Sequence, residues 1–274
     1  MNGQIVDMPA AEYHAHPALS RSRLWDFGQS ARAFRAVQTG EMEGKEETES
    51  MRLGSLVHAM LFEPDELKRF VTIPVEMLSS DGKATTKAAK LFKEDHADKT
   101  IVTANSYEAA QKVVKSLLAS RFAEWLALPG AKKEQTILWT DEETGVDLRC
   151  RVDLLLPAAS GLVFVADLKT TQDASPKAFR YSIKDYGYWL QYALYADGIE
   201  AATGKRPHEW YYVAASTKGA FEVAFHYLSM ETKAVAVEKY RDLLRQYAQA
   251  KATNVWRSPW DGDVNEIHLR DWEF

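Results

Sequence analysis

The sequence predicts a mixed α/β (α+β) fold, in which a central mixed sheet with an antiparallel hairpin is flanked by helices. Apolar residues recur at helical spacing before residue 63 and again over 105–120. From residue 133 the pattern changes to short β-rich runs separated by turn-like segments, and helices and strands then alternate. This order of elements is typical of a sheet covered by helices.

Composition limits the class of protein. The chain has 274 residues, of which 46% are hydrophobic, and this is enough for one large core. We expect a single domain over 1–274, with an N-terminal helical arm over 1–45 and a main body over 50–274, because a loop-rich stretch at 41–50 separates them. The single cysteine, Cys150, excludes an internal disulfide and a cysteine-rich zinc site.

No apolar run in the sequence reaches the roughly 18–20 residues of a membrane span. The N-terminal residues lack the basic start and apolar centre of a secretory signal. We therefore expect a cytoplasmic protein without membrane contact.

The charge of the chain argues against a nonspecific nucleic-acid binder. There are 34 Lys and Arg against 39 Asp and Glu, a net charge of −5. Five lysines nevertheless fall within 83–99. They form either a local binding patch or, as charge runs usually do, the solvated face of a helix.

Two short helices are predicted over 18–37. Ser20 or Ser22 is the expected N-cap of the first, and Ser30 lies near the start of the second. These helices make up most of the N-terminal arm.

Two longer helices follow. Helical spacing of apolar residues predicts one over 51–62, which Pro64 ends, so His58 lies on a mostly buried helix. Asn105 and Glu108 have the spacing of a capping box at the start of the next.

Three neighbouring strands are predicted over 133–140, 147–157 and 161–169, and at least the first two form a hairpin. A crossing helix, two strands and a long C-terminal helix follow over 185–204, 209–216, 220–229 and 231–250. The three tryptophans in these elements are expected in the core rather than at a base-stacking surface, namely Trp139, Trp189 and Trp210.

Five polar residues lie in elements that are otherwise apolar, and they are His58, Glu134, Asp153, Asp167 and Lys169. Burying an unpaired charge costs several kcal/mol, so this set predicts partners or a metal ion. Asp153 and Asp167 lie near the ends of neighbouring strands joined by the short turn 158–161, so their carboxylates can converge. Asp167 and Lys169 are two apart in one strand and point to the same side.

These residue types in this arrangement suit metal-assisted phosphodiester hydrolysis. Mg²⁺ prefers oxygen ligands, so carboxylates and a backbone carbonyl can hold it against a phosphate. A lysine such as Lys169 can orient or deprotonate the attacking water and offset charge on the phosphate. His58 could bind a metal ion directly or through another ligand.

The motif resembles that of a known superfamily. Asp153 followed by Asp167-x-Lys169 on the next strand is similar to the PD-(D/E)xK nuclease signature, although Val152 stands where that signature has proline. With His58, Glu134 and the Gln191-x-x-x-Tyr195 pattern, the set resembles the RecB-like branch.

Over residues 11–215 the chain further resembles the nuclease domain of the RecE family, which includes exonuclease VIII. This resemblance implies a PD-(D/E)xK nuclease-like fold and a Mg²⁺- or Mn²⁺-dependent exonuclease that degrades one strand of linear double-stranded DNA from 5′ to 3′ into mononucleotides. It also implies a ring-shaped homo-oligomer, a trimer or tetramer, that works with a RecT-type single-strand annealing protein in phage or prophage recombination.

The resemblance assigns roles to individual residues. It implies that the metal is held by Asp153, Asp167, Glu134, His58 and the backbone carbonyl of Leu168. Lys169 is the implied catalytic lysine. Gln191, Tyr195 and Thr170 are expected to support it or to contact the DNA backbone.

Structural alternatives remain for each of these residues. Asp167 and Lys169 can be a plain ion pair, and Asp153 can pair with Arg149 or Arg151. Glu134 can be a solvated strand end. His58 can be a hydrogen-bonded core histidine, and the Gln191 helix face can serve ordinary packing.

Two other functions also fit the motif. One is a RecB-like endonuclease or flap nuclease, because the same residues serve many modes of cleavage. The other is a catalytically silent DNA-binding recombination module that keeps the fold.

Overall fold

A six-stranded mixed sheet forms the centre of the protein in the computed structural model, which describes residues 2–157, 163–258, 260–262 and 264–268. The strands are β1 (Gly3–Val6), β4 (Lys132–Thr140), β5 (Asp147–Pro157), β6 (Val163–Thr171), β7 (Glu209–Ser216) and β8 (Val223–His226), in the spatial order β1-β4-β5-β6-β7-β8. Only β6 and β7 pair in parallel, and the other pairs in this sheet are antiparallel. The predicted mixed sheet with an antiparallel hairpin is confirmed. The turn 158–161 lies outside the described residues.

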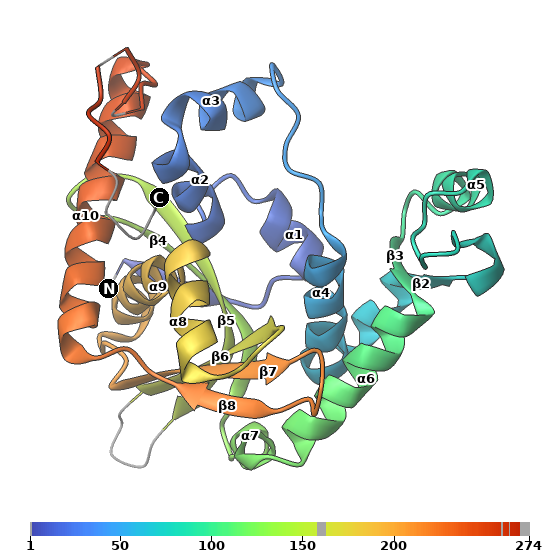
Figure 1. The fold of residues 1–274 in the computed structure, drawn as a ribbon. Coiled ribbons are helices and arrows are strands. Elements are labelled where there is room, and N and C mark those ends of the chain that lie inside the picture. Colours follow the sequence, from blue (N-terminus) through green and yellow to red (C-terminus); the bar gives the residue numbers. More distant parts are fainter. Residues whose placement is uncertain (1, 158–162, 259, 263, 269–274) are drawn as a thin grey trace.

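Helices flank this sheet (Figure 1). They are α1 (Ala10–Ala15), α2 (Arg21–Gln29), α3 (Ala31–Thr39), α4 (Glu49–Phe62), α5 (Lys87–Asp95), α6 (Ala104–Leu118), α7 (Arg121–Leu126), α8 (Pro176–Asp185), α9 (Tyr188–Thr203) and α10 (Met230–Thr253), with 3₁₀ turns at Pro64–Arg69 and Val75–Met77. One core cluster joins α2, α9 and α10 to the sheet and contains Trp139 and Trp210. A second joins α4, α6 and α7 to it. Trp189 is partly buried against Trp25, with ring centroids 6.1 Å apart.

The N-terminal helices of the predicted arm are present and pack into the first core cluster. Ser20, not Ser22, caps α2 by accepting from the Arg23 backbone N–H at 3.4 Å, and Ser30 caps α3. The sequence analysis missed β1, which pairs antiparallel with β4. Its partners are more than a hundred residues away, so no local pattern shows the pairing.

Helix α6 begins earlier than predicted, and the proposed capping box at its start is wrong. Thr103 is the N-cap, and its hydroxyl accepts from the Ser106 backbone N–H at 3.1 Å. Asn105 lies inside the helix, and Glu108 pairs with Lys112 one turn later.

The predicted crossing helix over 185–204 corresponds to α9, which begins at Tyr188 after Gly187, and a separate helix, α8, ends just before it at Asp185. This glycine has a φ of 64°, in the left-handed region, and a Cβ there would collide with the Trp25 ring. Only glycine fits both constraints. The sequence analysis missed α8, although Ser175 caps it and Pro176 occupies its first turn.

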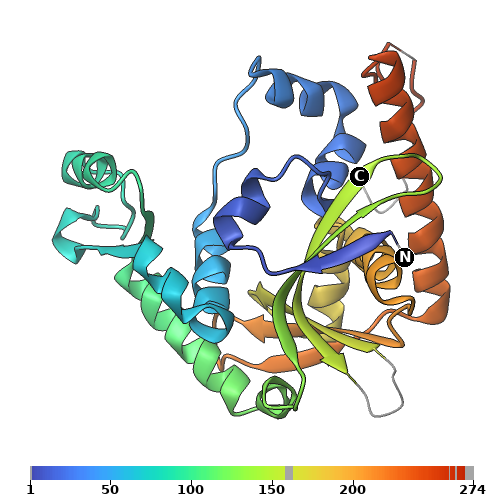
Figure 2. The same cartoon turned by 180° about the vertical axis from the view of Figure 1, so that it is seen from behind.

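A small lobe extends from the sheet beyond α6 (Figure 2). It contains the parallel pair β2 (Phe70–Ile73) and β3 (Thr100–Thr103), with α5 between them in sequence. The lysine run over 83–99 falls here. Lys83 and Lys99 pair with neighbouring aspartates, and Lys87 and Lys90 are exposed on α5, which favours a solvated helix face.

The described helices include none with both the length and the apolar character needed to cross a bilayer.

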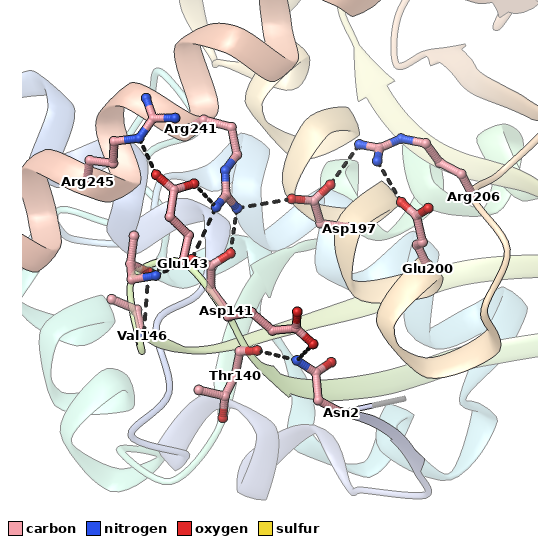
Figure 3. A network of polar contacts seen from close by, with 12 residues as sticks. Asn2, Thr140, Asp141, Glu143, Val146, Asp197, Glu200, Arg206, Arg241 and Arg245 are labelled. Atoms are coloured by element: carbon pink, nitrogen blue, oxygen red, sulfur yellow. Dashed lines mark hydrogen bonds and ion pairs between the residues drawn. The ribbon is translucent and has the colours of Figure 1, made fainter.

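A network of ion pairs fastens α10 to the β4–β5 turn and to α9 (Figure 3). The Arg241 guanidinium lies 2.5 Å from Asp141 Oδ2, 2.6 Å from Glu143 Oε2 and 3.5 Å from Asp197 Oδ2. Asp141 is buried. Burial alone would raise the pKa of Asp141, but the hydrogen bonds from Arg241 and Thr144 outweigh burial and lower it.

We expect Arg241→Met to lower the free energy of unfolding by about 2–4 kcal/mol near neutral pH, because it leaves a buried carboxylate without its partner. Asp141 has a lowered folded pKa, so its share of the stability is present above the unfolded pKa of about 3.9 and is lost as the pH falls below it. Urea denaturation should therefore show a smaller difference in the free energy of unfolding between Arg241→Met and the unaltered protein near pH 3 than near pH 7. Arg245→Met is the control, since its exposed pair should contribute below about 1 kcal/mol. Equal losses at both pH values would contradict this account.

Candidate metal and active site

The candidate site lies where strands β5 and β6 separate. Their pairing runs from Pro157 opposite Val163 to Leu154 opposite Ala166, and Asp153 and Asp167 come next on each strand. Here the Leu168 backbone N–H donates to Asp153 Oδ2 at 2.8 Å, so a carboxylate replaces a strand partner. Strand β6 stays paired with β7 beyond this point. The structure thus places both aspartates at one fork.

Three of the predicted residues form a compact group at the fork, namely His58, Glu134 and Asp153. His58 comes from α4, with its Nδ1 3.3 Å from Glu134 Oε1 and its Nε2 3.8 Å from Asp153 Oδ2. Each residue offers one ligand atom, and these atoms all lie within 4.8 Å of one another. Ligands on opposite sides of Mg²⁺ lie about 4.2 Å apart, so a small inward movement would let the group hold a divalent ion.

The backbone of Glu134 is strained. Its φ is 48°, and the regular pairing of β4 with β5 includes Lys133 opposite Leu154 and Gln135 opposite Val152 but not Glu134. A non-glycine residue in the left-handed region costs about 1–3 kcal/mol, and such residues cluster at functional sites. The strained residue, Glu134, is also the one whose side chain contacts His58.

Asp167 and Lys169 form a second group beside the first. The Lys169 Nζ makes an ion pair with Asp167 Oδ2, and Gln191 Nε2 donates to Asp167 Oδ1 at 2.5 Å. The Lys169 side chain is 14% exposed, so it reaches the surface at the mouth of the site. Its ammonium lies 4.9 Å from the centroid of the Tyr188 ring.

The pKa values of the site show an excess of buried acid. Burial and the Asp167 carboxylate raise the pKa of Asp153 to about 7. Burial alone would lower the pKa of His58, but the Asp153 and Glu134 carboxylates outweigh burial and raise it to about 9. For Lys169 the opposing effect of burial is likewise outweighed, chiefly by Asp167, and its pKa is raised. A divalent cation would relieve this excess of negative charge.

Arg151 positions the acids of the site, a role that the sequence analysis missed. Its guanidinium donates to Glu134 Oε2 at 2.7 Å and to Glu63 Oε1 at 2.5 Å. The suggestion that Arg149 or Arg151 pairs with Asp153 is wrong. Arg149 instead binds backbone carbonyls of the N-terminal segment, including that of Tyr13.

The remaining predicted residues lie close to this site but not always as expected. Gln191 contacts Asp167 rather than Lys169. Tyr195 is buried with its ring 5.8 Å from that of Trp210, so the predicted contact with the DNA backbone does not fit its position. Thr170 Oγ1 lies 3.1 Å from where a Cβ of Gly54 in α4 would be, so the helix approaches β6 closely there.

Two predicted metal contacts are not part of the His58 group. The Asp167 carboxylate would have to exchange Lys169 or Gln191 for an ion before it could bind one. Leu168 lies at the fork through its N–H, and the predicted role of its carbonyl stays a prediction.

The fold and this constellation define a nuclease-like α/β domain. A family profile described as PDDEXK-like domain of unknown function (DUF3799) matches residues 20–261, and the chain belongs to this family. It is therefore a member of the PD-(D/E)xK nuclease superfamily, as the motif indicated. No curated protein sequence matches the chain.

The fold is also similar to a solved structure. A protein from Eubacterium rectale, described as a candidate exonuclease, aligns with a TM-score of 0.62 over 97% of both chains at 14% identity. At this identity the similarity concerns the fold alone. The structure of SSO0001 aligns with a TM-score of 0.32 at 10% identity, over 71% of this chain and 84% of that chain.

We expect Asp153→Asn to weaken Mn²⁺ binding at least about tenfold, the loss that even an outer partner of a metal ligand produces. His58 and Asp153 must lose their protons to bind the ion, and their pKa values lie at about 9 and about 7. Affinity should therefore rise with pH, by about tenfold per unit for each proton displaced.

Isothermal titration calorimetry between about pH 6 and pH 9 measures both effects. Glu222→Gln is the matched control, since it makes the same kind of change on an exposed residue. Unchanged binding in Asp153→Asn would remove this residue from the ligand set.

Proposed function

We propose that this protein is a metal-dependent exodeoxyribonuclease that degrades one strand of linear double-stranded DNA from the 5′ end into mononucleotides. The observation that carries the proposal is the His58–Glu134–Asp153 group beside Lys169, at the fork of β5 and β6. The exonuclease mode is supported by the RecE-type resemblance over residues 11–215 and by the description of the structurally similar Eubacterium rectale protein as a candidate exonuclease.

The residues of the chain supply most of the machinery. Asp153, Glu134 and His58 would hold Mg²⁺ or Mn²⁺, and Arg151 keeps Glu134 oriented. When bound, the ion would act as a Lewis acid and lower the pKa of an attacking water.

Lys169 would act on the phosphate. Its raised pKa means that the ammonium keeps its proton at neutral pH, so it would stabilise negative charge developing on the scissile phosphate. This role replaces that of a base that removes a proton from water. Gln191 holds Asp167, and Asp167 in turn holds the lysine at the mouth of the site.

Assembly and partners belong to the same proposal. A ring-shaped trimer or tetramer would keep the enzyme on DNA despite its net charge of −5, because encirclement does not depend on the overall field. We further propose a single domain, a cytoplasmic location and cooperation with a RecT-type annealing protein.

We expect Lys169→Met to lower the rate of DNA hydrolysis by roughly 10²- to 10⁴-fold, because it removes the positive charge beside the phosphate. Lys251→Met, an exposed residue on α10, should retain the rate of the unaltered protein. The measurement is release of acid-soluble nucleotides from linear duplex DNA with Mg²⁺. Activity in Lys169→Met close to that of the unaltered protein would overturn the proposed role.

The mode of cleavage is tested with blocked substrates. Linear duplexes with phosphorothioate linkages at the 5′ ends should resist digestion, whereas those blocked at the 3′ ends should be degraded. A covalently closed circle should stay intact. Cleavage of the circle would favour the endonuclease alternative, and no metal binding and no hydrolysis at all would favour a silent DNA-binding module.

A further inference from the structure

Helix α8 presents a basic and aromatic face to solvent, and its C-terminal end leads to Tyr188 beside Lys169. Its buried side carries Phe179, and its exposed side carries Lys177, Arg180, Tyr181 and Lys184. These four residues recur at spacings of three and four, so they share one face, which we call the α8 face. Within the described part of the chain, its three cations have no ion-pair partner.

Two tyrosines lie between the C-terminal end of α8 and Lys169. The Tyr188 ring lies 4.9 Å from the Lys169 ammonium, and the Tyr186 ring lies 5.8 Å from that of Tyr188. Tyr188 is half-buried, whereas Tyr186 is 59% exposed at the C-terminal end of α8. The exposed Tyr186 ring is therefore separated from the proposed catalytic lysine by one intervening ring, that of Tyr188.

The turn that carries Tyr186 is held in place by α2. Arg21 Nη1 donates to the Tyr186 carbonyl at 3.0 Å. The next residue, Gly187, packs directly against the Trp25 ring. A platform fixed before binding lowers the entropy cost of stacking a base on it.

We propose that the α8 face and Tyr186 bind an unpaired DNA strand next to the cut site. One base stacks on the Tyr186 ring, and the strand's phosphates lie along Lys177, Arg180 and Lys184. Bases of a duplex do not offer their faces to a side chain, so the aromatic surface favours an unpaired strand. This inference rests on the proposed nuclease function, because the location of Lys169 defines where the strand enters.

The dimensions of the α8 face agree with this occupant. From Lys177 to Lys184 the helix advances about 10 Å, at about 1.5 Å per residue. Phosphates of one stacked strand follow one another at about 3.4 Å along its axis, so the face covers about three nucleotides. The side chains of lysine and arginine are long enough to follow a less regular strand as well.

The first test measures the salt dependence of binding. The probe is a fluorescein-labelled oligodeoxythymidylate of about 12 nucleotides in EDTA, where hydrolysis does not occur. Neutralising Lys177, Arg180 and Lys184 together to Gln should reduce the slope of log affinity against log salt by about 2, since each single-strand phosphate contact contributes about 0.7.

The control changes the same number of charges elsewhere. Lys87→Gln, Lys90→Gln and Lys239→Gln alter exposed lysines of α5 and α10 and should leave the slope unchanged. An equal change of slope in both triple variants would show a bulk charge effect and overturn the inference.

The second test concerns the stacked base. Tyr186→Ala should weaken binding of the same probe roughly 5- to 100-fold, and Tyr186→Phe should retain it. A probe made of abasic nucleotides should show no difference between the unaltered protein and Tyr186→Ala. Tyr227→Ala removes an equally exposed ring after β8 and serves as the control.

The outcome for this inference is separate from that for the nuclease. Hydrolysis with unchanged KM in Tyr186→Ala, together with unchanged binding, would refute the α8 face and leave the nuclease intact. A protein without hydrolysis that still shows the slope change and the Tyr186 effect would support the α8 face and refute the nuclease.

Discussion

The hydrogen bond from the Leu168 N–H to the Asp153 carboxylate is the constraint on which the rest of the site depends. Beyond Leu154 and Ala166, strands β5 and β6 no longer pair, and a buried strand cannot leave its N–H groups without acceptors. The Asp153 side chain supplies the acceptor. The carboxylate is thereby fixed at the fork, where α4 adds His58 and β4 adds Glu134.

The same arrangement concentrates negative charge in a place that solvent barely reaches. Asp153 and Asp167 are both buried, and their repulsion adds to desolvation in raising the pKa of Asp153. Of the neighbouring cations, Lys169 pairs with Asp167, and Arg151 is shared between Glu134 and Glu63. The oxygen and imidazole donors of the His58–Glu134–Asp153 group suit a divalent metal ion.

Much of the fold could be predicted from local sequence, because the spacing of hydrophobic residues and the presence of turn residues can be recognised within a few neighbouring positions. The hairpin of β4 and β5, the long C-terminal helix and the acidic fork were of this kind. What local sequence could not show was long-range pairing. Strand β1 is defined by its pairing with β4, which is distant in the sequence. The N-cap of α6 falls on Thr103 because β3 ends there.

The contacts that support the site also could not be predicted from local sequence alone. Arg151 lies opposite Thr136 in the register, so Glu134 is its diagonal neighbour across the strands. That pairing follows once the register is known, and the register itself follows from the hairpin. Gln191 and Tyr195 share the α9 helix but reach different partners, because the helix packs one against the fork and the other into the core.

The break between α8 and α9 connects the N-terminal helices to the site. The two helices cannot form one continuous helix, because Gly187 has a φ of 64°. Gly187 turns the chain instead, and Trp25 of α2 occupies the space that any other side chain would need. The N-terminal helices therefore do more than cover the first core cluster, because α2 holds the turn between Tyr186 and Tyr188, and Tyr188 lies beside Lys169. One turn thus fixes Tyr186 and Tyr188, and through Tyr188 it links the fold of the first thirty residues to the Lys169 side chain at the fork.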